Sequence, residues 1–402
     1  MKNEKLLEIF KRYYPNVKEE NISSSFCPYR VCPVGAHIDH QKGNVTGFAI
    51  DKGITCLYAK TSSHLFEAAS LNFPGKKGGS VVNISAPQND WADYLRGTAK
   101  LLNEKYDIEE GIYCLLDGEL PIGGISSSAA VIIAFATSLC KANEIELSDE
   151  EMIHLVQEVE NKYIGVNSGL LDQSCETLSK KDHLLYLDIN NNTHKLIKKS
   201  EKMSPYEIAI IFSGVKRTLV GSQYNTRVDE LKSASYCLKA FSRMEYGKYQ
   251  DSVLRDVPKD IYLEYKHQLP ENFRRRAEHY YSEMDRVERG VKAWQQGNLV
   301  EFGKISTESG NSSIENYEAG SKELIEIHNI MKQTDGIYGG RFSGAGFKGC
   351  CLALIDPSYE ESIKEEITRK YLEVFPEYKS SFGIYYCNTS DGVNLGKVKV
   401  KK

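Results

Sequence analysis

Residues 27–40, with the sequence Cys-Pro-Tyr-Arg-Val-Cys-Pro-Val-Gly-Ala-His-Ile-Asp-His, concentrate side chains that can bind a polar substrate. Arg30, His37 and Asp39 fall within a span of ten residues. The two prolines of this stretch lack a backbone donor and fix φ, so we expect neither a regular helix nor a central strand here. The pattern favours a loop whose polar groups contact a substrate, and a charged, solvated turn is the alternative interpretation.

Residues 119–130, Glu-Leu-Pro-Ile-Gly-Gly-Ile-Ser-Ser-Ser-Ala-Ala, contain glycines followed by serines that open an apolar helix predicted over residues 126–142. The free N–H groups at such a helix start, together with the helix dipole, can bind phosphate. A serine hydroxyl in this position can also reach a phosphate-bound Mg²⁺. An ordinary glycine turn with a serine N-cap is the alternative. The loop is not a Walker A motif, because no Gly-Lys-Ser/Thr follows, and the chain has no His-Arg-Asp or Asp-Phe-Gly element of protein kinases.

Length and composition indicate an ordinary globular protein. The chain has 402 residues, of which 41% are hydrophobic and 26% charged, so two domains are expected. A net charge of −4 gives no general affinity for nucleic acid or anionic membranes. The ten cysteines show no Cys-x-x-Cys pair and no spacing typical of a zinc site. The N-terminal sequence does not resemble a signal peptide, and the longest apolar run is too short to span a bilayer. We therefore expect a cytoplasmic, monomeric protein without nucleic-acid or membrane partners.

Strand-like and helical patterns alternate along the chain, which predicts an α/β (α+β) fold. Asp117-Gly118 is a turn signal, and the polar run near residues 190–205 suggests a domain boundary. We predict domains at residues 1–202 and 203–390, with residues 391–402 forming a strand and tail that pair back with the first domain. The predicted strands are 54–60, 81–84, 112–116, 184–189, 208–212, 350–355, 383–387 and 393–400, and the predicted helices are 1–14, 126–142, 149–162, 274–296, 299–310 and 321–332.

Several segments in this order resemble motifs of the GHMP small-molecule kinases, and within them the galactokinases. Residues 29–40, 121–129 and 342–349 resemble the three motifs of the superfamily. Residues 90–94, 165–173 and 222–227 resemble segments of the galactokinase branch. The resemblance implies a two-domain GHMP kinase fold with the active site in the cleft between the domains. It also implies an ATP-dependent sugar 1-kinase that uses Mg²⁺ and a small-molecule sugar or sugar acid.

The resemblance also assigns roles to individual residues. Asp172 resembles the residue that accepts or orients the proton of the anomeric hydroxyl, and Arg30 resembles its charged partner. Ser128 and Glu160 resemble the Mg²⁺ contacts. The implied sugar contacts are Ala36, His37, Asp39 and Tyr224; the implied ATP contacts are Gly123, Gly124, Ser126, Ser127, Ser128 and Trp91; and Gly344 and Gly346 are implied to line the floor of the site.

Three positions depart from the galactokinase pattern. The second motif is one residue shorter, with Ile125 in place of leucine, and Lys348 replaces a glycine of the third motif. Ala36 stands where galactokinases carry a glutamate that binds the 6-hydroxyl, and its surroundings resemble the galacturonokinase version of the motif. Our hypothesis is therefore a galacturonate 1-kinase, with galactose or L-arabinose as alternative substrates. A non-catalytic sugar sensor is the alternative of another class, although Asp172, Arg30 and Ser128 are all present.

Overall fold

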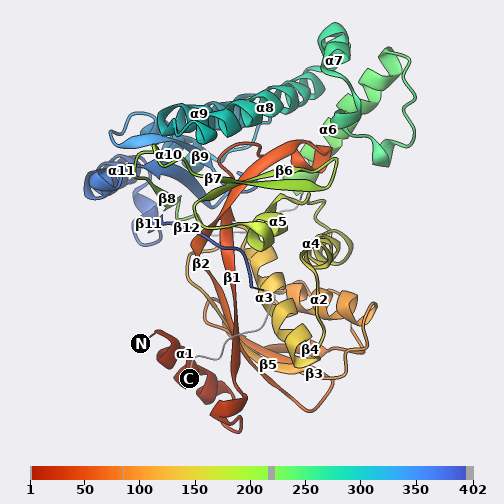
Figure 1. Ribbon diagram of the computed structural model, residues 1–402, viewed down its shortest axis with the longest axis vertical. Coiled ribbons are helices and arrows are strands. Elements are labelled where there is room, and N and C mark those ends of the chain that lie inside the picture. The colour runs from red at the N-terminus through yellow and green to blue at the C-terminus, as the bar shows by residue number, and fades with distance from the viewer. Residues whose placement is uncertain (1, 85, 216–221, 395–402) are drawn as a thin grey trace.

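The computed structural model describes residues 2–84, 86–215 and 222–394, and it contains two β-sheets with helices packed against them (Figure 1). This arrangement confirms the α/β class expected from the sequence. The predicted boundary at residue 202 falls between a strand of one sheet that ends at Lys198 and the first strand of the other, which begins at Glu207, and it stays a prediction.

The larger sheet is built around β2, a long strand that contacts most of the other strands. Within the described residues this sheet has eight strands in the order β4-β3-β5-β2-β6-β7, with β1 and β12 also paired to β2. The pairings are antiparallel except between β3 and β5. The bounds are β1 Ser23–Val31, β2 Asn44–Lys60, β3 Leu65–Ser70, β4 Lys77–Ser80, β5 Ile112–Gly118, β6 His183–Asp188, β7 Thr193–Lys198 and β12 Thr389–Ser390.

The smaller sheet is antiparallel and has, in the described part of the chain, four strands in the order β11-β8-β10-β9. Its strands are β8 Glu207–Phe212, β9 Ile337–Phe342, β10 Cys350–Ile355 and β11 Gly383–Cys387. Alternate residues of β10 enter two different hydrophobic cores, as the period of a strand requires. One of these cores also contains side chains of β1, β2 and β5, so it joins the two sheets.

The helices cover both sheets. Helices α3 and α5 pack on the long strands β1 and β2, and α2 and α4 pack on these helices in turn. Helices α8 and α9 run side by side at the top of the molecule in Figure 1. The bounds are α1 Lys2–Tyr13, α2 Asp93–Asn103, α3 Ser127–Ala142, α4 Asp149–Glu158, α5 Leu171–Leu178, α6 Ser222–Phe241, α7 Lys259–Tyr265, α8 Glu271–Gln295, α9 Leu299–Glu315, α10 Lys322–Met331 and α11 Glu360–Val374.

Most predicted helices are confirmed to within a few residues, but three predictions about strands and turns are wrong. Residues 81–84 are not a strand. The strand β4 ends before them, at Ser80, and its glycines let the backbone lie close to Phe66. Asp117 and Gly118 do not turn the chain, since they pair with Thr55 and Ile54 inside the sheet. The expected loop at Arg30 is part of β1, whose register with β2 shifts between Pro28 and Arg30.

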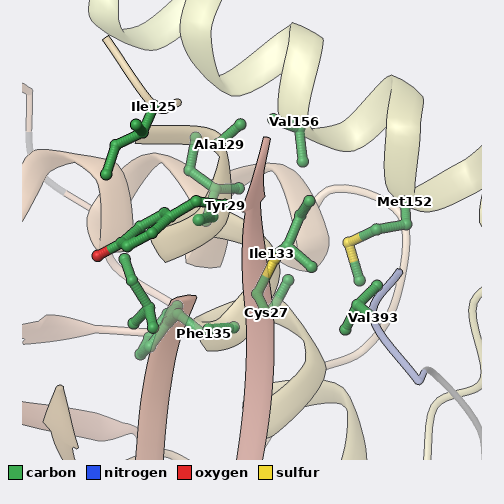
Figure 2. Close-up of a cluster of buried hydrophobic side chains, with 14 of the residues drawn as sticks. Cys27, Tyr29, Ile125, Ala129, Ile133, Phe135, Met152, Val156 and Val393 are labelled. Atoms are coloured by element: carbon green, nitrogen blue, oxygen red, sulfur yellow. The ribbon is translucent and has the colours of Figure 1, made fainter. Parts of the chain in front are cut away.

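Residues 389–390 form β12, which pairs with β2 of the larger sheet. The predicted pairing of residues 391–402 with the first domain stays a prediction. The strand predicted for residues 393–400 lies mostly outside the described residues. Figure 2 shows Val393 next to Met152 of α4, in a cluster that also holds Cys27 and Tyr29 of β1 and Ile133 of α3. Helix α3 is apolar nearly all round because it packs between these elements.

Gly47 of β2 sets the distance between the larger sheet and helix α5. A Cβ atom at this position would lie 2.1 Å from Cys175 Sγ, so only a residue without a side chain lets the helix approach this closely. Because Cys175 is on the same helix as Asp172, this contact also determines where Asp172 lies.

We predict that Gly47→Ala lowers the free energy of unfolding by roughly 1–3 kcal/mol, the usual cost of overpacking a core. The double variant Gly47→Ala/Cys175→Ala removes the clashing sulfur and should recover most of that loss. Denaturant unfolding of both single variants and the double variant gives the coupling energy. Additive losses would contradict direct packing of Gly47 against Cys175.

Candidate functional site

Arg30 and Asp172 form an ion pair in the wall of a cavity of about 630 Å³. Arg30 Nε donates a hydrogen bond to Asp172 Oδ1 at 2.7 Å, although the residues lie 142 positions apart in the sequence. Arg30 Nη1 donates to the carbonyl oxygen of Gly124 at 3.0 Å. Burial alone would lower the pKa of the Arg30 guanidinium, but the charge and hydrogen bond of Asp172 outweigh it and raise that pKa. The arginine therefore keeps its positive charge.

Secondary structure holds both partners of this pair. Arg30 follows the register shift of β1, and its side chain is only 4% exposed. Asp172 lies in the first turn of α5, where the helix dipole stabilises a negative charge. Its side chain is 30% exposed, so the carboxylate is accessible from the cavity.

The glycine-rich loop before α3 lines the same cavity with Gly123, Gly124, Ser126, Ser127 and Ser128. Gly124 has a φ of +82°, and a Cβ there would lie 2.8 Å from Cys350 Sγ, so this loop packs directly on the smaller sheet. Ser126 is the N-cap residue of α3, but it has a left-handed φ of +61° and its side chain makes no capping hydrogen bond. The predicted serine cap is therefore wrong at this residue.

Ser128 and Glu160 are adjacent in the cavity wall. Ser128 Oγ donates to Glu160 Oε1 at 2.9 Å. Glu160 belongs to a π-helical turn, Val159–Ile164, that continues α4. Burial, followed by the charge of Asp172, raises the pKa of Glu160. A hydroxyl and a carboxylate at this distance offer the oxygen ligands that Mg²⁺ prefers.

Glu176 provides a third carboxyl near the Arg30–Asp172 pair, and the sequence patterns did not predict it. It lies one helical turn after Asp172 on α5 and is fully buried. Neither of its oxygens makes a hydrogen bond of good geometry, although the Ser126 hydroxyl lies close. Burial and then the charge of Asp172 raise its pKa well above the usual range. Its position four residues after Asp172 could have indicated that both carboxyls lie on the same face of α5, because residues four apart share a helix face.

Ala36, His37 and Asp39 also line the cavity. His37 Nε2 donates to the carbonyl oxygen of Gly344 at 2.9 Å, and its ring stacks on Tyr317 at 4.3 Å between centroids. Burial and then the charge of Arg341 lower the pKa of His37 well below its usual value, so the imidazole is neutral. Asp39 Oδ2 accepts a hydrogen bond from Leu171 N at 3.2 Å.

The remaining sequence candidates divide into those that line the cavity and those that do not. Tyr224 of α6, Gly344 and Lys348 line it. The lining does not include Gly346, which packs on the Phe342 ring, or Trp91, whose indole stacks on Phe73 at 5.9 Å between centroids. The expected roles of Trp91 and Gly346 stay predictions.

The cysteines, possible metal ligands and helices of the described residues add further observations. Their cysteines are free thiols, mostly buried, and no cluster of three or more His, Cys, Asp or Glu side chains among them is arranged to hold a metal ion. Within the same residues, no helix has the length and apolar character needed to cross a membrane. The lining of the site combines Arg30 and Lys348 with several carboxyls, hydroxyls and a glycine-rich loop, and burial raises the pKa of its Cys32 thiol to about 12.

Two family models match the chain: the GHMP kinases N terminal domain over residues 93–180 and the GHMP kinases C terminal domain over residues 291–373. A galacturonokinase of Arabidopsis thaliana is 36% identical in an alignment 393 residues long that covers 92% of this chain and 92% of the other. A galactokinase of Staphylococcus saprophyticus is 30% identical and covers 92% of this chain and 94% of its own length.

The fold is also similar to solved structures. The galactokinase of Lactococcus lactis complexed with galactose superposes with a TM-score of 0.89 at 26% identity, covering 98% of this chain and all of the other. A mevalonate kinase superposes with a TM-score of 0.64 at 17% identity, which shows a shared fold.

The environment of Asp39 predicts a measurable dependence of stability on pH. Burial, followed by the charge of Asp172, raises the pKa of Asp39 from 3.8 to about 6. The buried carboxylate therefore costs stability above about pH 6, and this cost disappears as the pH falls towards the unfolded-state pKa of 3.8. We predict that Asp39→Asn raises the free energy of unfolding at pH 8 by on the order of 2–3 kcal/mol, with little effect near pH 4.

Denaturant unfolding at both pH values measures this difference. The matched control is Asp335→Asn, because Asp335 is exposed, and we expect no comparable gain from it. An Asp39→Asn variant that is no more stable than the parent protein at pH 8 would show that the Asp39 carboxylate is well solvated.

Proposed function

Because this chain belongs to the galactokinase-like sugar kinases of the GHMP family, we propose that it transfers the γ-phosphoryl group of ATP to the anomeric hydroxyl of a galacto-configured sugar. We further propose that its preferred sugar is D-galacturonate. The observation that carries the reaction is the Arg30–Asp172 ion pair, which lies beside the glycine-rich loop in one cavity.

In this proposal Asp172 orients the anomeric hydroxyl and accepts its proton as the oxygen attacks the γ-phosphorus. The oxygen–phosphorus bond to ADP breaks as the bond to the sugar forms, so ADP leaves with the electron pair. Arg30 stabilises negative charge on the transferring group, since its guanidinium stays protonated beside Asp172. Direct transfer depends mainly on positioning and electrostatics, and it needs no covalent intermediate with the protein.

We assign the phosphate and metal contacts to the loop and its neighbours. Backbone N–H groups at the start of α3 and the loop glycines would hold the triphosphate. Ser128 and Glu160 would hold Mg²⁺ through one hydroxyl and one carboxylate, which fits an ion that keeps several ligands from substrate phosphates and water. The bound ion would neutralise charge on the phosphates.

Ala36 is the residue on which the choice of sugar depends. With the anomeric oxygen at Asp172, we place the C6 group of the sugar near Ala36 and His37, which line the same cavity. A glutamate at residue 36 would repel a C6 carboxylate by ~4 kcal/mol at ~4 Å and an effective dielectric of ~20, nearly a thousandfold in affinity. Alanine removes this repulsion and leaves room for the carboxylate, which supports galacturonate.

Galactose is the second candidate substrate, because the chain is also similar over nearly its whole length to a galactokinase solved with galactose. For galactose, alanine in place of glutamate loses a charge-assisted hydrogen bond of roughly 1.5–3 kcal/mol. Against a non-catalytic sugar sensor stands the set of Arg30, Asp172, Ser128 and Glu160, all of which line the cavity.

We predict that a coupled assay of ADP formation gives a higher kcat/KM with galacturonate than with galactose or L-arabinose. Asp172→Asn keeps a hydrogen-bond acceptor for Arg30 but cannot take the proton, so kcat should fall on the order of 10²–10⁴-fold. ATP affinity, measured by calorimetry, should change little in this variant. Faster turnover on galactose would overturn the proposed substrate, and an unchanged kcat in Asp172→Asn would overturn the proposed mechanism.

A second prediction concerns Ala36. Ala36→Glu should reduce kcat/KM for galacturonate by up to roughly a thousandfold and leave galactose turnover equal or higher. Ala36→Gln has nearly the same size without the charge, and it therefore separates steric exclusion from electrostatic repulsion. Equal losses with the glutamate and glutamine variants would mean that volume rather than charge excludes the sugar acid.

A further inference from the structure

A buried cluster of charged side chains packs against the loop that contains Gly35, Ala36 and His37. We propose that Arg286, Glu283 and Arg341, which together carry one excess positive charge, act as positioning residues that favour a sugar bearing a C6 carboxylate. This inference rests on the proposed function, because it assumes that the C6 group lies near Ala36.

Glu283 of α8 is the centre of the cluster and holds the loop directly. Its Oε1 accepts a hydrogen bond from Gly35 N at 2.7 Å, and its Oε2 accepts one from Arg286 Nε at 2.6 Å. Glu283 is fully buried, and Arg286 is 8% exposed. The nearby arginines, Arg286 first, hold the pKa of Glu283 down to about 2 against the effect of burial, so it is ionised.

Arg341 of β9 supplies the second positive charge. Its Nη1 lies 3.8 Å from Glu283 Oε1, and its Nη2 donates to Ser313 Oγ at 2.9 Å. The residue is fully buried. Two guanidinium groups therefore share one carboxylate in a region where uncompensated charge is poorly screened.

The cluster is coupled to the cavity through the loop. Gly35, which Glu283 binds, precedes Ala36, and His279 Nε2 donates to the Ala36 carbonyl oxygen at 3.0 Å. The charge of Arg341 lowers the pKa of His37, which shows that its field reaches a residue lining the cavity. Because burial keeps His37 neutral, the positive charges next to this loop are those of the arginines.

Asp39 contributes negative charge on the side of the cavity that faces α5. The absolute potential at C6 therefore depends on several groups, whereas the effect of changing the cluster has a definite sign. A more positive cluster should favour the sugar acid over the neutral sugar, and a less positive cluster should do the reverse.

Two substitutions that change the charge of the cluster in opposite directions test this inference, and a third that keeps the charge is the control. Arg286→Met removes one positive charge and leaves the Glu283–Arg341 pair, whereas Arg286→Lys keeps the charge. Glu283→Gln removes the negative charge and keeps an oxygen that can accept from Gly35 N. The measurement is the ratio of the dissociation constants of galacturonate and galactose, determined on the same preparation so that the folded fraction cancels.

We expect Arg286→Met to shift this ratio roughly tenfold towards galactose, Glu283→Gln to shift it in the opposite direction, and Arg286→Lys to leave it near the parent value. Equal changes for both sugars, or no change, would overturn the role of the cluster even if the protein prefers galacturonate. A parent protein that prefers galactose would overturn the proposed substrate, but the two opposite shifts would still support the cluster. Binding of neither sugar would overturn both proposals.

Discussion

The ion pair between Arg30 and Asp172 is the contact on which the rest of the site depends. It joins β1 of the larger sheet to the first turn of α5, and the same arginine bonds the glycine-rich loop through Gly124. A buried arginine needs a close carboxylate, because the cost of desolvation is otherwise large. The close approach of α5 to β2 at Gly47 places that carboxylate where the arginine requires it.

Charged groups of both signs surround the cavity. Around the ion pair, Asp172, Glu160 and Glu176 lie near Arg30, and burial raises the pKa of both glutamates. Asp39, which accepts a hydrogen bond from Leu171 N next to Asp172, adds a further carboxyl to the lining. Ala36 brings no charge, His37 is neutral, and the Arg286–Glu283–Arg341 cluster, bonded to the same loop at Gly35, carries two positive charges and one negative charge.

Local sequence patterns predicted α1, α3, α4, α8, α9, α10 and the loop before α3, because each depends on short-range periodicity or on a contiguous motif. The predicted cavity residues, such as Asp172 and Glu160, came from the resemblance to a kinase family. Local patterns failed where distant pairing decides the structure. The prolines near Arg30 suggested a loop, but pairing with β2 accommodates them in β1 through a register shift. Asp117-Gly118 suggested a turn, but the sheet holds it extended. Glu283 and Arg341 could not be connected to Ala36 from sequence, since only tertiary packing brings α8 and β9 behind that loop.

In the proposed reaction, the Arg30–Asp172 pair directs phosphorylation to the anomeric oxygen of a sugar acid. NMR spectra of the product formed from ATP and ¹³C-labelled D-galacturonate show the position of the phosphate through carbon–phosphorus couplings. We expect coupling of phosphorus to C1 and C2, with no product from the Asp172→Asn variant. Phosphate attached at another carbon, or release of inorganic phosphate without a sugar phosphate, would contradict the proposed reaction.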